Sequence, residues 1–190
     1  MALPQEKRYT YADILDWPED ERVELIYGEV YMLNTPLRIH EIISRRLYLK
    51  IGNYLEGKTC EVYDAPFGIR LFAKKGDSPY NVDTVVVPDL SIICDPDKLD
   101  DYGCAGAPDL VIEILSPSTM RNDRLLKFNL YQKAGVEEYW IVDPEAKVVQ
   151  VMTLEDGQYH VPLVYTAHDT VPVGVLEDCK IDLKPVFEGI

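Results

Sequence analysis

The chain has 190 residues, of which 47% are hydrophobic and 27% are charged. This balance is typical of a folded soluble protein, and the length suits one domain with a substantial core. The 33 acidic residues outnumber the 19 basic ones, so the net charge of −14 repels nucleic acid at long range. There is no apolar run as long as the about 20 residues of a membrane helix, and the first residues lack a signal-peptide pattern. We therefore expect a cytoplasmic protein with no membrane partner.

The cysteines and histidines do not form a metal-binding pattern. Cysteines stand at positions 60, 94, 104 and 179 without a Cys-x-x-Cys pair, and the histidines at 40, 160 and 168 lack zinc-ligand spacing. In a cytoplasmic chain with a core of this size, we expect free thiols and not a disulfide scaffold.

Residue patterns predict helices and strands in alternation through the first half of the chain. A short helix around residues 13–17 is expected to end at Pro18. Residues 22–32 are typical of two strands around a Tyr27-Gly28 turn. From Leu37 to Leu55, apolar residues recur with a helical period. Three further candidate strands are Glu61–Tyr63, Phe67–Phe72 and Val85–Ile93.

The second half begins with residues 95–106, whose Asp and Gly content predicts an exposed loop. Leu110–Leu115 is a continuous apolar run with one carboxylate, which is typical of a strand covered on both faces. Ser116–Thr119 would end that strand and cap a helix from about Met120 to Ala134. Further strands are expected at Glu138–Val142, Val148–Leu154, Tyr159–Tyr165 and near Val171, before a tail to Ile190. These elements predict a mixed α/β sheet flanked by helices, in a single domain over residues 1–190.

Glu113 is the first candidate site residue, because a carboxylate inside an apolar strand is costly to ionise unless it is paired or metal-bound. Asp89 opens another strand, and two adjacent strands could join both acids in a hard-oxygen site for Mg²⁺. Asp109 competes with Asp89, but it lies about 13 Å from Glu113 along the same strand, too far to share one ion. Asp89 is therefore the better partner if its strand neighbours that of Glu113. The alternative is a structural, salt-bridged Glu113.

Lys127 is the candidate cation of this site. Asp123, Lys127 and Tyr131 recur every four residues and form one row on the predicted helix, beside an apolar row. Packing of the apolar row on the sheet would direct Lys127 toward a strand end, where it could hold a phosphate oxygen or orient a water molecule. The alternative is a solvated Asp123–Lys127 pair. Glu24 and His40 are further polar candidates on elements expected to pack against the sheet.

Other catalytic motifs are absent from the sequence. There is no Gly-rich phosphate loop, no Gly-x-Gly-x-x-Gly and no Gly-x-Ser-x-Gly. Three histidines give no support to a Ser/His/Asp arrangement, and the 13 tyrosines are too scattered to predict a stacking platform for single strands.

Five segments carry motifs whose order is more specific than any one of them. They are Glu24–Glu29 with His40, Val87–Leu90, Ala107–Thr119, Asp123-x-x-x-Lys127-x-x-x-Tyr131, and Gly135–Pro144. In this order they resemble the Uma2 family, which belongs to the PD-(D/E)XK restriction-endonuclease-like superfamily. The resemblance covers about residues 10–165, and Tyr27 stands where the family is expected to have an aspartate.

The resemblance implies a restriction-endonuclease-like fold and a Mg²⁺-dependent endonuclease that hydrolyses DNA. Asp89 and Glu113 would be the acids of the two main motifs, and with a main-chain carbonyl near Ile114 they would hold the ion, which Mn²⁺ could replace. Glu24 would be the acid of an earlier motif, and His40 would lie near the site.

The superfamily usually has a lysine two positions beyond the second acid, where this chain has Leu115. The resemblance therefore implies a migrated lysine, Lys127, supplied by the following helix. Restriction-like folds commonly act as dimers, so we also expect a homodimer that pairs through the strand-rich segment 138–165.

Two rival functions remain on the sequence alone. A binding or regulatory protein could keep this fold without turnover, and the net charge of −14 favours it. A carboxylate-pair hydrolase such as a glycosidase would need two acids but no lysine or metal, and ranks last.

Overall fold

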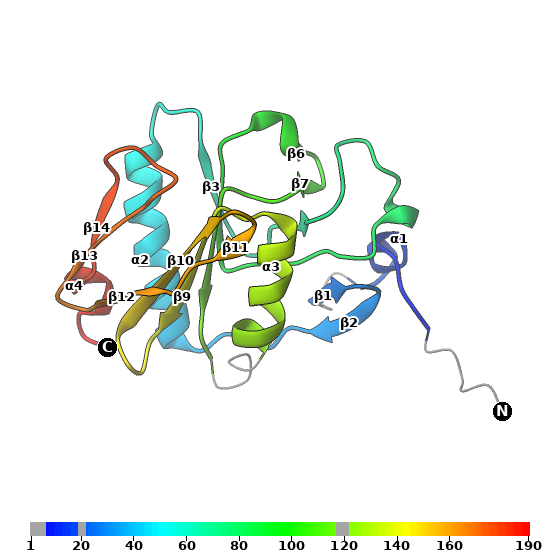
Figure 1. The fold of residues 1–190 in the computed structure, drawn as a ribbon. Helices are drawn as coiled ribbons and strands as arrows, with labels where there is room; N and C mark the ends of the chain where they lie inside the picture. The colour runs from blue at the N-terminus through cyan, green and yellow to red at the C-terminus, as the bar shows by residue number, and fades with distance from the viewer. Residues whose placement is uncertain (1–6, 19–21, 117–121) are drawn as a thin grey trace.

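The computed structural model describes residues 7–18, 22–116 and 122–190, with the backbone alone for residues 122–124. A seven-stranded sheet crosses the middle of the molecule (Figure 1), in the order β11-β10-β9-β8-β5-β3 with β12 also paired to β10. Its strands are β3 (Glu61–Asp64), β5 (Leu90–Ile93), β8 (Leu110–Ile114), β9 (Glu138–Asp143), β10 (Val148–Glu155), β11 (Gln158–Tyr159) and β12 (Leu163–Thr166). β8 and β9 are parallel, whereas the other neighbours are antiparallel. The mixed sheet confirms the predicted fold class.

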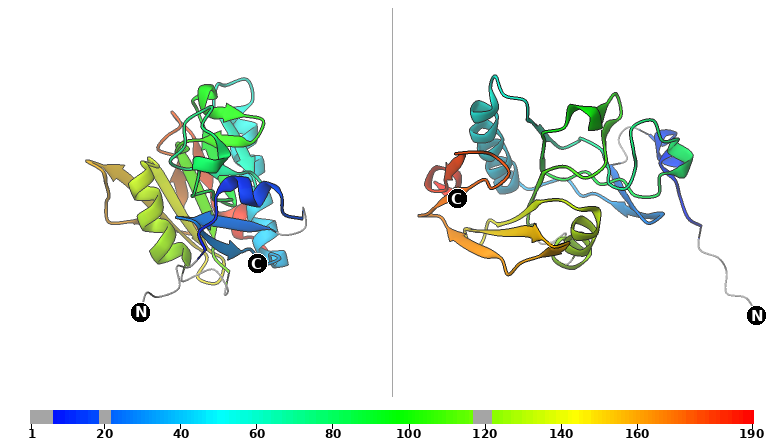
Figure 2. Two further views of the ribbon diagram at one scale, coloured as in Figure 1. Left: turned by 90° about the vertical axis from the view of Figure 1, so that its right-hand side faces the viewer. Right: turned by 45° about the horizontal axis from the view of Figure 1, so that its top comes forward.

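Helices cover both faces of this sheet (Figures 1 and 2). α2 (Arg38–Leu55) packs on one face, and the π-helical turns η3 (Asn122–Lys127) lead into α3 (Phe128–Ala134) on the other. Ile112 belongs to the core beside α2, and its neighbour Val111 belongs to the core beside α3. Because successive strand residues point to opposite faces, a strand between two helices needs apolar residues throughout. All five residues of β8 are buried, as predicted.

The parallel pairing of β8 and β9 requires a crossover, which η3 and α3 supply. The predicted helix ends as expected, with Gly135 in the left-handed conformation at φ 87°. The predicted cap at Ser116–Thr119 and the start at Met120 lie outside the described residues, apart from Ser116.

An N-terminal hairpin lies beside the main sheet. It follows α1 (Tyr11–Leu15) and consists of β1 (Val23–Ile26) and β2 (Glu29–Met32), as predicted. Tyr27 and Gly28 form its turn with φ of 51° and 79°, the conformation that two-residue hairpin turns favour. Leu25 makes an isolated bridge with Val85, which fixes the hairpin against the segment leading to β5.

Residues 95–106 do not form the exposed loop expected from their composition. They contain η2 (Pro96–Lys98), β6 (Leu99–Asp100) and the buried β7 (Gly103–Ala105). β7 lies between β6 and β4 (Ile69–Arg70) and pairs with both in a three-stranded sheet. Gly103 has φ 112°, and a Cβ atom there would lie 2.1 Å from the Gly68 carbonyl oxygen. Gly103 therefore permits close packing of two backbone segments. The composition of residues 95–106 had instead suggested that their glycines serve a flexible loop.

Three expected strands are shorter than predicted. Residues 67–72 form only β4, and a separate turn η1 (Pro79–Asn81) follows. In the segment 85–93, strand pairing is regular only over β5, and Pro88 interrupts it because proline has no N–H to donate. Pro162 likewise lies between β11 and β12.

The C-terminal tail is part of the core. β13 (Thr170–Pro172) confirms the strand expected near Val171, and it pairs with β14 (Lys180–Asp182). α4 (Lys184–Phe187) buries Val186 and Phe187 in the core beside α2. Among the described residues, no helix is both long and apolar enough to span a membrane.

Two of the four cysteines form a disulfide, so the expectation of free thiols is wrong for this pair. Cys60 and Cys94 are bonded, whereas Cys104 and Cys179 are free and buried. Glu61 pairs with Ile93 in the antiparallel ladder, so the next position in the same register brings Cys60 opposite Cys94. This proximity depends on strand pairing and cannot be derived from cysteine spacing.

Candidate active site

Asp89 and Glu113 meet because their strands are antiparallel neighbours. Leu90 pairs with Ile112, and one further step in that register places Asp89 opposite Glu113. Side chains at such cross-strand positions are about 5 Å apart at Cβ. The Ile114 N–H donates to Asp89 Oδ2 over 2.7 Å, which fixes the Asp89 carboxylate against the end of β8.

Asp109 is used elsewhere. Its Oδ2 accepts a hydrogen bond from the Cys94 N–H over 2.7 Å, just before β8 begins. Asp89 was preferred to Asp109 on the condition that its strand neighbours the strand of Glu113. The pairing of β5 with β8 meets this condition.

Lys127 is buried between two carboxylates. Its Nζ lies 2.8 Å from Glu113 Oε1 and 3.0 Å from Glu24 Oε1. Lys127, Glu113 and Glu24 are 5%, 4% and 3% exposed. The expected direction of Lys127 toward a strand end is thus observed, whereas the alternative of a solvated lysine is wrong. The Asp123 side chain lies outside the described residues.

Tyr131 completes the surroundings of Glu113. Its hydroxyl donates to Glu113 Oε1 over 2.7 Å, and its side chain is fully buried. Burial, followed by the nearby charges of Glu113 and Glu24, raises the pKa of Tyr131 well above its ordinary value. The phenol therefore remains a hydrogen-bond donor. Sequence reasoning placed Tyr131 in one row with Lys127 but assigned it no role; that shared row was the available signal.

Glu24 reaches the site from the N-terminal hairpin. Its Oε1 accepts from the Val87 N–H over 2.9 Å and also contacts Lys127. Since the bridge between Leu25 and Val85 holds β1 beside this segment, the chain leading to Asp89 also positions Glu24.

His40 reaches the site from the first turn of α2. Its Nε2 lies 3.0 Å from Asp89 Oδ2, and its Nδ1 lies 3.8 Å from Glu41 Oε1. The five predicted side chains Glu24, His40, Asp89, Glu113 and Lys127 are thus connected through two contact networks, one at Asp89 and one at Glu113.

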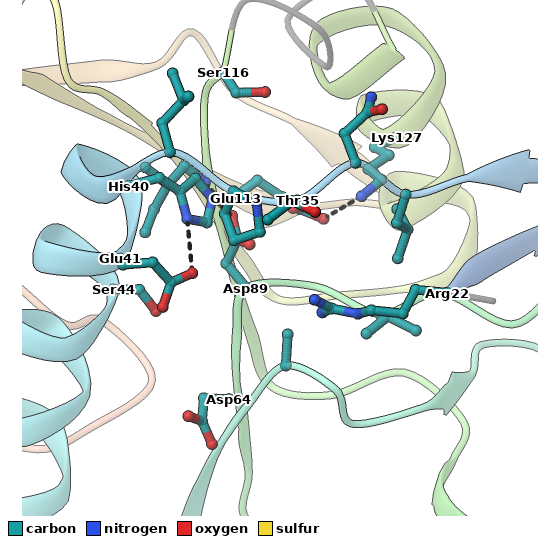
Figure 3. Close-up of a pocket in the computed structure, with 17 residues that line it drawn as sticks. Arg22, Thr35, His40, Glu41, Ser44, Asp64, Asp89, Glu113, Ser116 and Lys127 are labelled. Atoms are coloured by element: carbon teal, nitrogen blue, oxygen red, sulfur yellow. Dashed lines mark hydrogen bonds and ion pairs between the residues drawn. The ribbon is translucent and has the colours of Figure 1, made fainter. Parts of the chain in front are cut away.

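A pocket of about 500 Å³ is lined by His40, Asp89, Glu113 and Lys127 but not by Glu24 (Figure 3). Its charged lining includes the predicted Asp89, Glu113 and Lys127, with Ile114 beside them. Sequence reasoning missed Arg22, Glu41 and Asp64, which also line it. Within the described part of the chain, four carboxylates line the pocket against one lysine and one arginine, a balance that favours a bound cation.

Asp89 and Glu113 offer oxygen donors of the kind that Mg²⁺ prefers. Among the described residues, no group of three or more His, Cys, Asp and Glu side chains could hold a metal. Mg²⁺ commonly uses one or two carboxylates and keeps several water ligands, so Asp89 and Glu113 on adjacent strands are a suitable pair. Oxygen ligands with no cysteine also match its preference for hard donors.

A model of the Uma2 family, described as "Putative restriction endonuclease", matches residues 11–184. The chain belongs to the Uma2 family. Over 160 residues it is 29% identical to "Uncharacterized protein slr1290" of Synechocystis sp. (strain ATCC 27184 / PCC 6803 / Kazusa), which covers 83% of this chain and 80% of the relative. This similarity spans most of both proteins.

The fold of this Uma2 chain is shared with a crystal structure from Anabaena variabilis ATCC 29413. That protein is described as "a putative nuclease belonging to DUF820". The TM-score is 0.73 at 22% sequence identity, and the match covers 94% of this chain and 97% of the other. The family and fold expected from the ordered motifs are therefore confirmed.

Proposed function

We propose that this Uma2 chain is a Mg²⁺-dependent endonuclease-like phosphodiesterase that hydrolyses DNA. The observation that carries the proposal is the convergence of Asp89, Glu113 and Lys127 at one pocket. The descriptions of the family and of the similar Anabaena protein support the same class of activity.

In this proposal Asp89, Glu113 and the main-chain carbonyl near Ile114 hold Mg²⁺, and Mn²⁺ can take its place. When bound, such an ion stabilises charge on a phosphoryl oxygen and lowers the pKa of a water ligand. In the overall reaction, the water oxygen bonds to phosphorus, a P–O ester bond breaks, and the leaving oxygen gains a proton.

The side chains around the carboxylates have separate roles. Lys127 neutralises negative charge that develops on the phosphoryl group. Its contacts with Glu113 and Glu24 fix the position of its Nζ for this role. Tyr131 orients Glu113, and His40 orients Asp89 through the hydrogen bonds described above. Glu24 thus acts through Lys127, whereas Asp89 and Glu113 serve the metal site directly.

The second candidate is a binding or regulatory protein that keeps the fold without turnover. The net charge of −14 and the acidic pocket lining favour it, because both disfavour a polyanionic substrate. Metal binding without hydrolysis would characterise this alternative.

Nicking of supercoiled DNA tests the proposal. Wild-type protein should convert the plasmid to the open circle with Mg²⁺ or Mn²⁺, and a chelator should stop the reaction. Glu113→Gln should be inactive. Asp109→Asn is the matched control and should remain active, because the Asp109 carboxylate accepts its hydrogen bond from the Cys94 N–H, away from the site. A metal-binding wild type that leaves DNA and RNA uncut would favour the binding protein.

We also propose that two copies pair through β12, the strand at one edge of the main sheet. Leu163 and Val164 are 61% and 57% exposed, and residues 161–167 include no charged side chain. Edge strands normally carry charges that prevent such pairing, and an antiparallel two-fold contact would bury this neutral edge of an acidic chain. Light scattering should show a dimer for the wild type and a monomer for Val164→Lys; a monomeric wild type would contradict the pairing.

A further inference from the structure

Among the residues that the structure describes, the pocket lining includes one lysine and one arginine, Lys127 and Arg22, in different electrostatic settings. Lys127 is buried and its ammonium group contacts two carboxylates, those of Glu113 and Glu24. Arg22 lines the same pocket but is exposed, and no described residue forms an ion pair or hydrogen bond with its side chain. Lys127 thus shares its charge with two carboxylates of the site, whereas the charge of Arg22 meets no described protein group and is available to a second part of a ligand.

The backbone around Arg22 is held in the hairpin. Arg22 directly precedes β1, and its carbonyl oxygen accepts from the Leu33 N–H over 2.9 Å, which extends the pairing of β1 with β2. Arg22 and Glu24 are two residues apart, so an extended chain directs both side chains to the same face. In Figure 3 the Arg22 side chain extends from the hairpin toward the interior of the pocket.

Arg22 lies at a distance from the carboxylates of the site. Two strand residues span about 6.6 Å, which is the expected distance along the backbone from Arg22 to Glu24. The Glu24 carboxylate in turn contacts Lys127. A phosphodiester chain that placed its scissile phosphate at Asp89, Glu113 and Lys127 would therefore bring a flanking phosphate toward Arg22.

We propose that Arg22 is a substrate-binding residue that takes a phosphate flanking the scissile one. This inference rests on the proposed function, because it assumes a phosphodiester chain in the pocket. A guanidinium group can donate two parallel N–H bonds to phosphate oxygens, which gives both charge and orientation. Arg22 would also supply local positive charge, which a chain of net charge −14 needs in order to retain a polyanion.

Two Arg22 variants separate charge from geometry. Arg22→Gln removes the charge, and Arg22→Lys keeps the charge but loses the planar pair of donors. Lys180→Gln is the charge-matched control, because Lys180 is exposed on β14 and does not line the pocket. All three proteins should unfold at the wild-type temperature, since no described contact of the Arg22 side chain is lost.

The measurements are DNA binding and steady-state nicking. Binding of a fluorescein-labelled DNA duplex is followed by anisotropy with Ca²⁺ in place of Mg²⁺, as a function of salt. Arg22→Gln should bind about 10-fold to 100-fold more weakly, the loss expected for one charge-assisted phosphate contact. The slope of log affinity against log salt should fall by about 0.9. In nicking with Mg²⁺, KM should rise while kcat is retained, and Arg22→Lys should be intermediate.

The outcomes distinguish this inference from the proposed function. If wild-type protein nicks DNA while Arg22→Gln matches Lys180→Gln in affinity and salt slope, the role of Arg22 is wrong and the nuclease proposal stands. If the wild type neither binds nor nicks nucleic acid, both proposals fail. A loss of kcat at unchanged KM would also overturn the assignment, because it would place Arg22 at the reacting phosphate.

Discussion

Lys127 Nζ lies 2.8 Å from Glu113 Oε1, although 14 residues separate the two along the chain. The β8-η3-α3-β9 crossover produces this contact, because it returns the helix over the face of the strand that carries Glu113. Leu115, two positions beyond Glu113, is buried and 4% exposed. The amine therefore reaches the carboxylate from the helix.

The Lys127–Glu113–Glu24 cluster predicts the effect of Lys127→Met. This variant leaves two carboxylates without their buried cation, so nicking should be lost and the free energy of unfolding should fall by about 3 to 5 kcal/mol. Chemical denaturation and the nicking assay measure both effects. Glu113→Gln/Lys127→Met removes both charges and should recover part of the stability while remaining inactive. Full activity of either protein would contradict the role of Lys127.

The Tyr131 hydroxyl predicts a positioning effect. Tyr131→Phe keeps the ring packed against Tyr139, with centroids 5.0 Å apart, but removes the donor to Glu113 Oε1. We expect a loss of about 1.5 to 3 kcal/mol in stability, weaker Mn²⁺ binding and a lower kcat. Tyr159→Phe is the matched control, because its hydroxyl donates to the Val136 carbonyl instead. Equal Mn²⁺ affinities for the two variants would argue against positioning by Tyr131.

The proposed carboxylate pair predicts which acid binds the metal. In calorimetric titrations with Mn²⁺, Asp89→Asn should abolish the binding heat, and Asp109→Asn should retain it because Asp109 contacts Cys94 away from the pocket. The reverse result would transfer the metal role to Asp109.

The disulfide predicts how many free thiols the unfolded protein has. When the protein is unfolded without reductant, a thiol reagent should react only with Cys104 and Cys179. Cys60→Ser/Cys94→Ser should lower the free energy of unfolding by about 3 to 4 kcal/mol, because it opens a loop closed over a separation of 34 residues. Wild type in reductant is the control and should match the double variant. A count of four thiols without reductant would show that the bond is absent.

The buried thiol of Cys104 predicts a change in stability at alkaline pH. Burial raises its pKa from 9.0 to about 11. The unfolded thiol therefore ionises first, and the stabilisation by Cys104 should be constant below pH 9.0 and lost as pH rises toward about 11. Denaturation curves of wild type and Cys104→Ala should converge over that range. A constant difference between them would contradict the shift.

The elements with strong residue periodicity were predictable from the sequence. The apolar run of β8 required cover on both faces, and the helical row placed Lys127 and Tyr131 on one side of the crossover. Asp89 could be chosen as the partner of Glu113 only if their strands were neighbours, and the sequence does not show which strands are neighbours. Pairing of β5 with β8 meets that condition.

Features that depend on pairing between distant short segments were not predictable. β6 and β7 have two and three residues, too few to show an alternating pattern, so composition alone suggested a loop. The Cys60–Cys94 bond follows from the register of β3 and β5. Arg22 was missed because a single arginine before a strand has no distinctive spacing, and only the closed hairpin directs it into the pocket.

The hairpin of β1 and β2 is a separate sheet from the main one, yet it carries Glu24, and Arg22 directly precedes it. The main sheet therefore holds Asp89 and Glu113, whereas the hairpin brings Glu24 to Lys127 and places Arg22 in the pocket lining. Under the proposed function, changes in the hairpin would alter which nucleic acid is accepted, while the main sheet would keep its two acids in place.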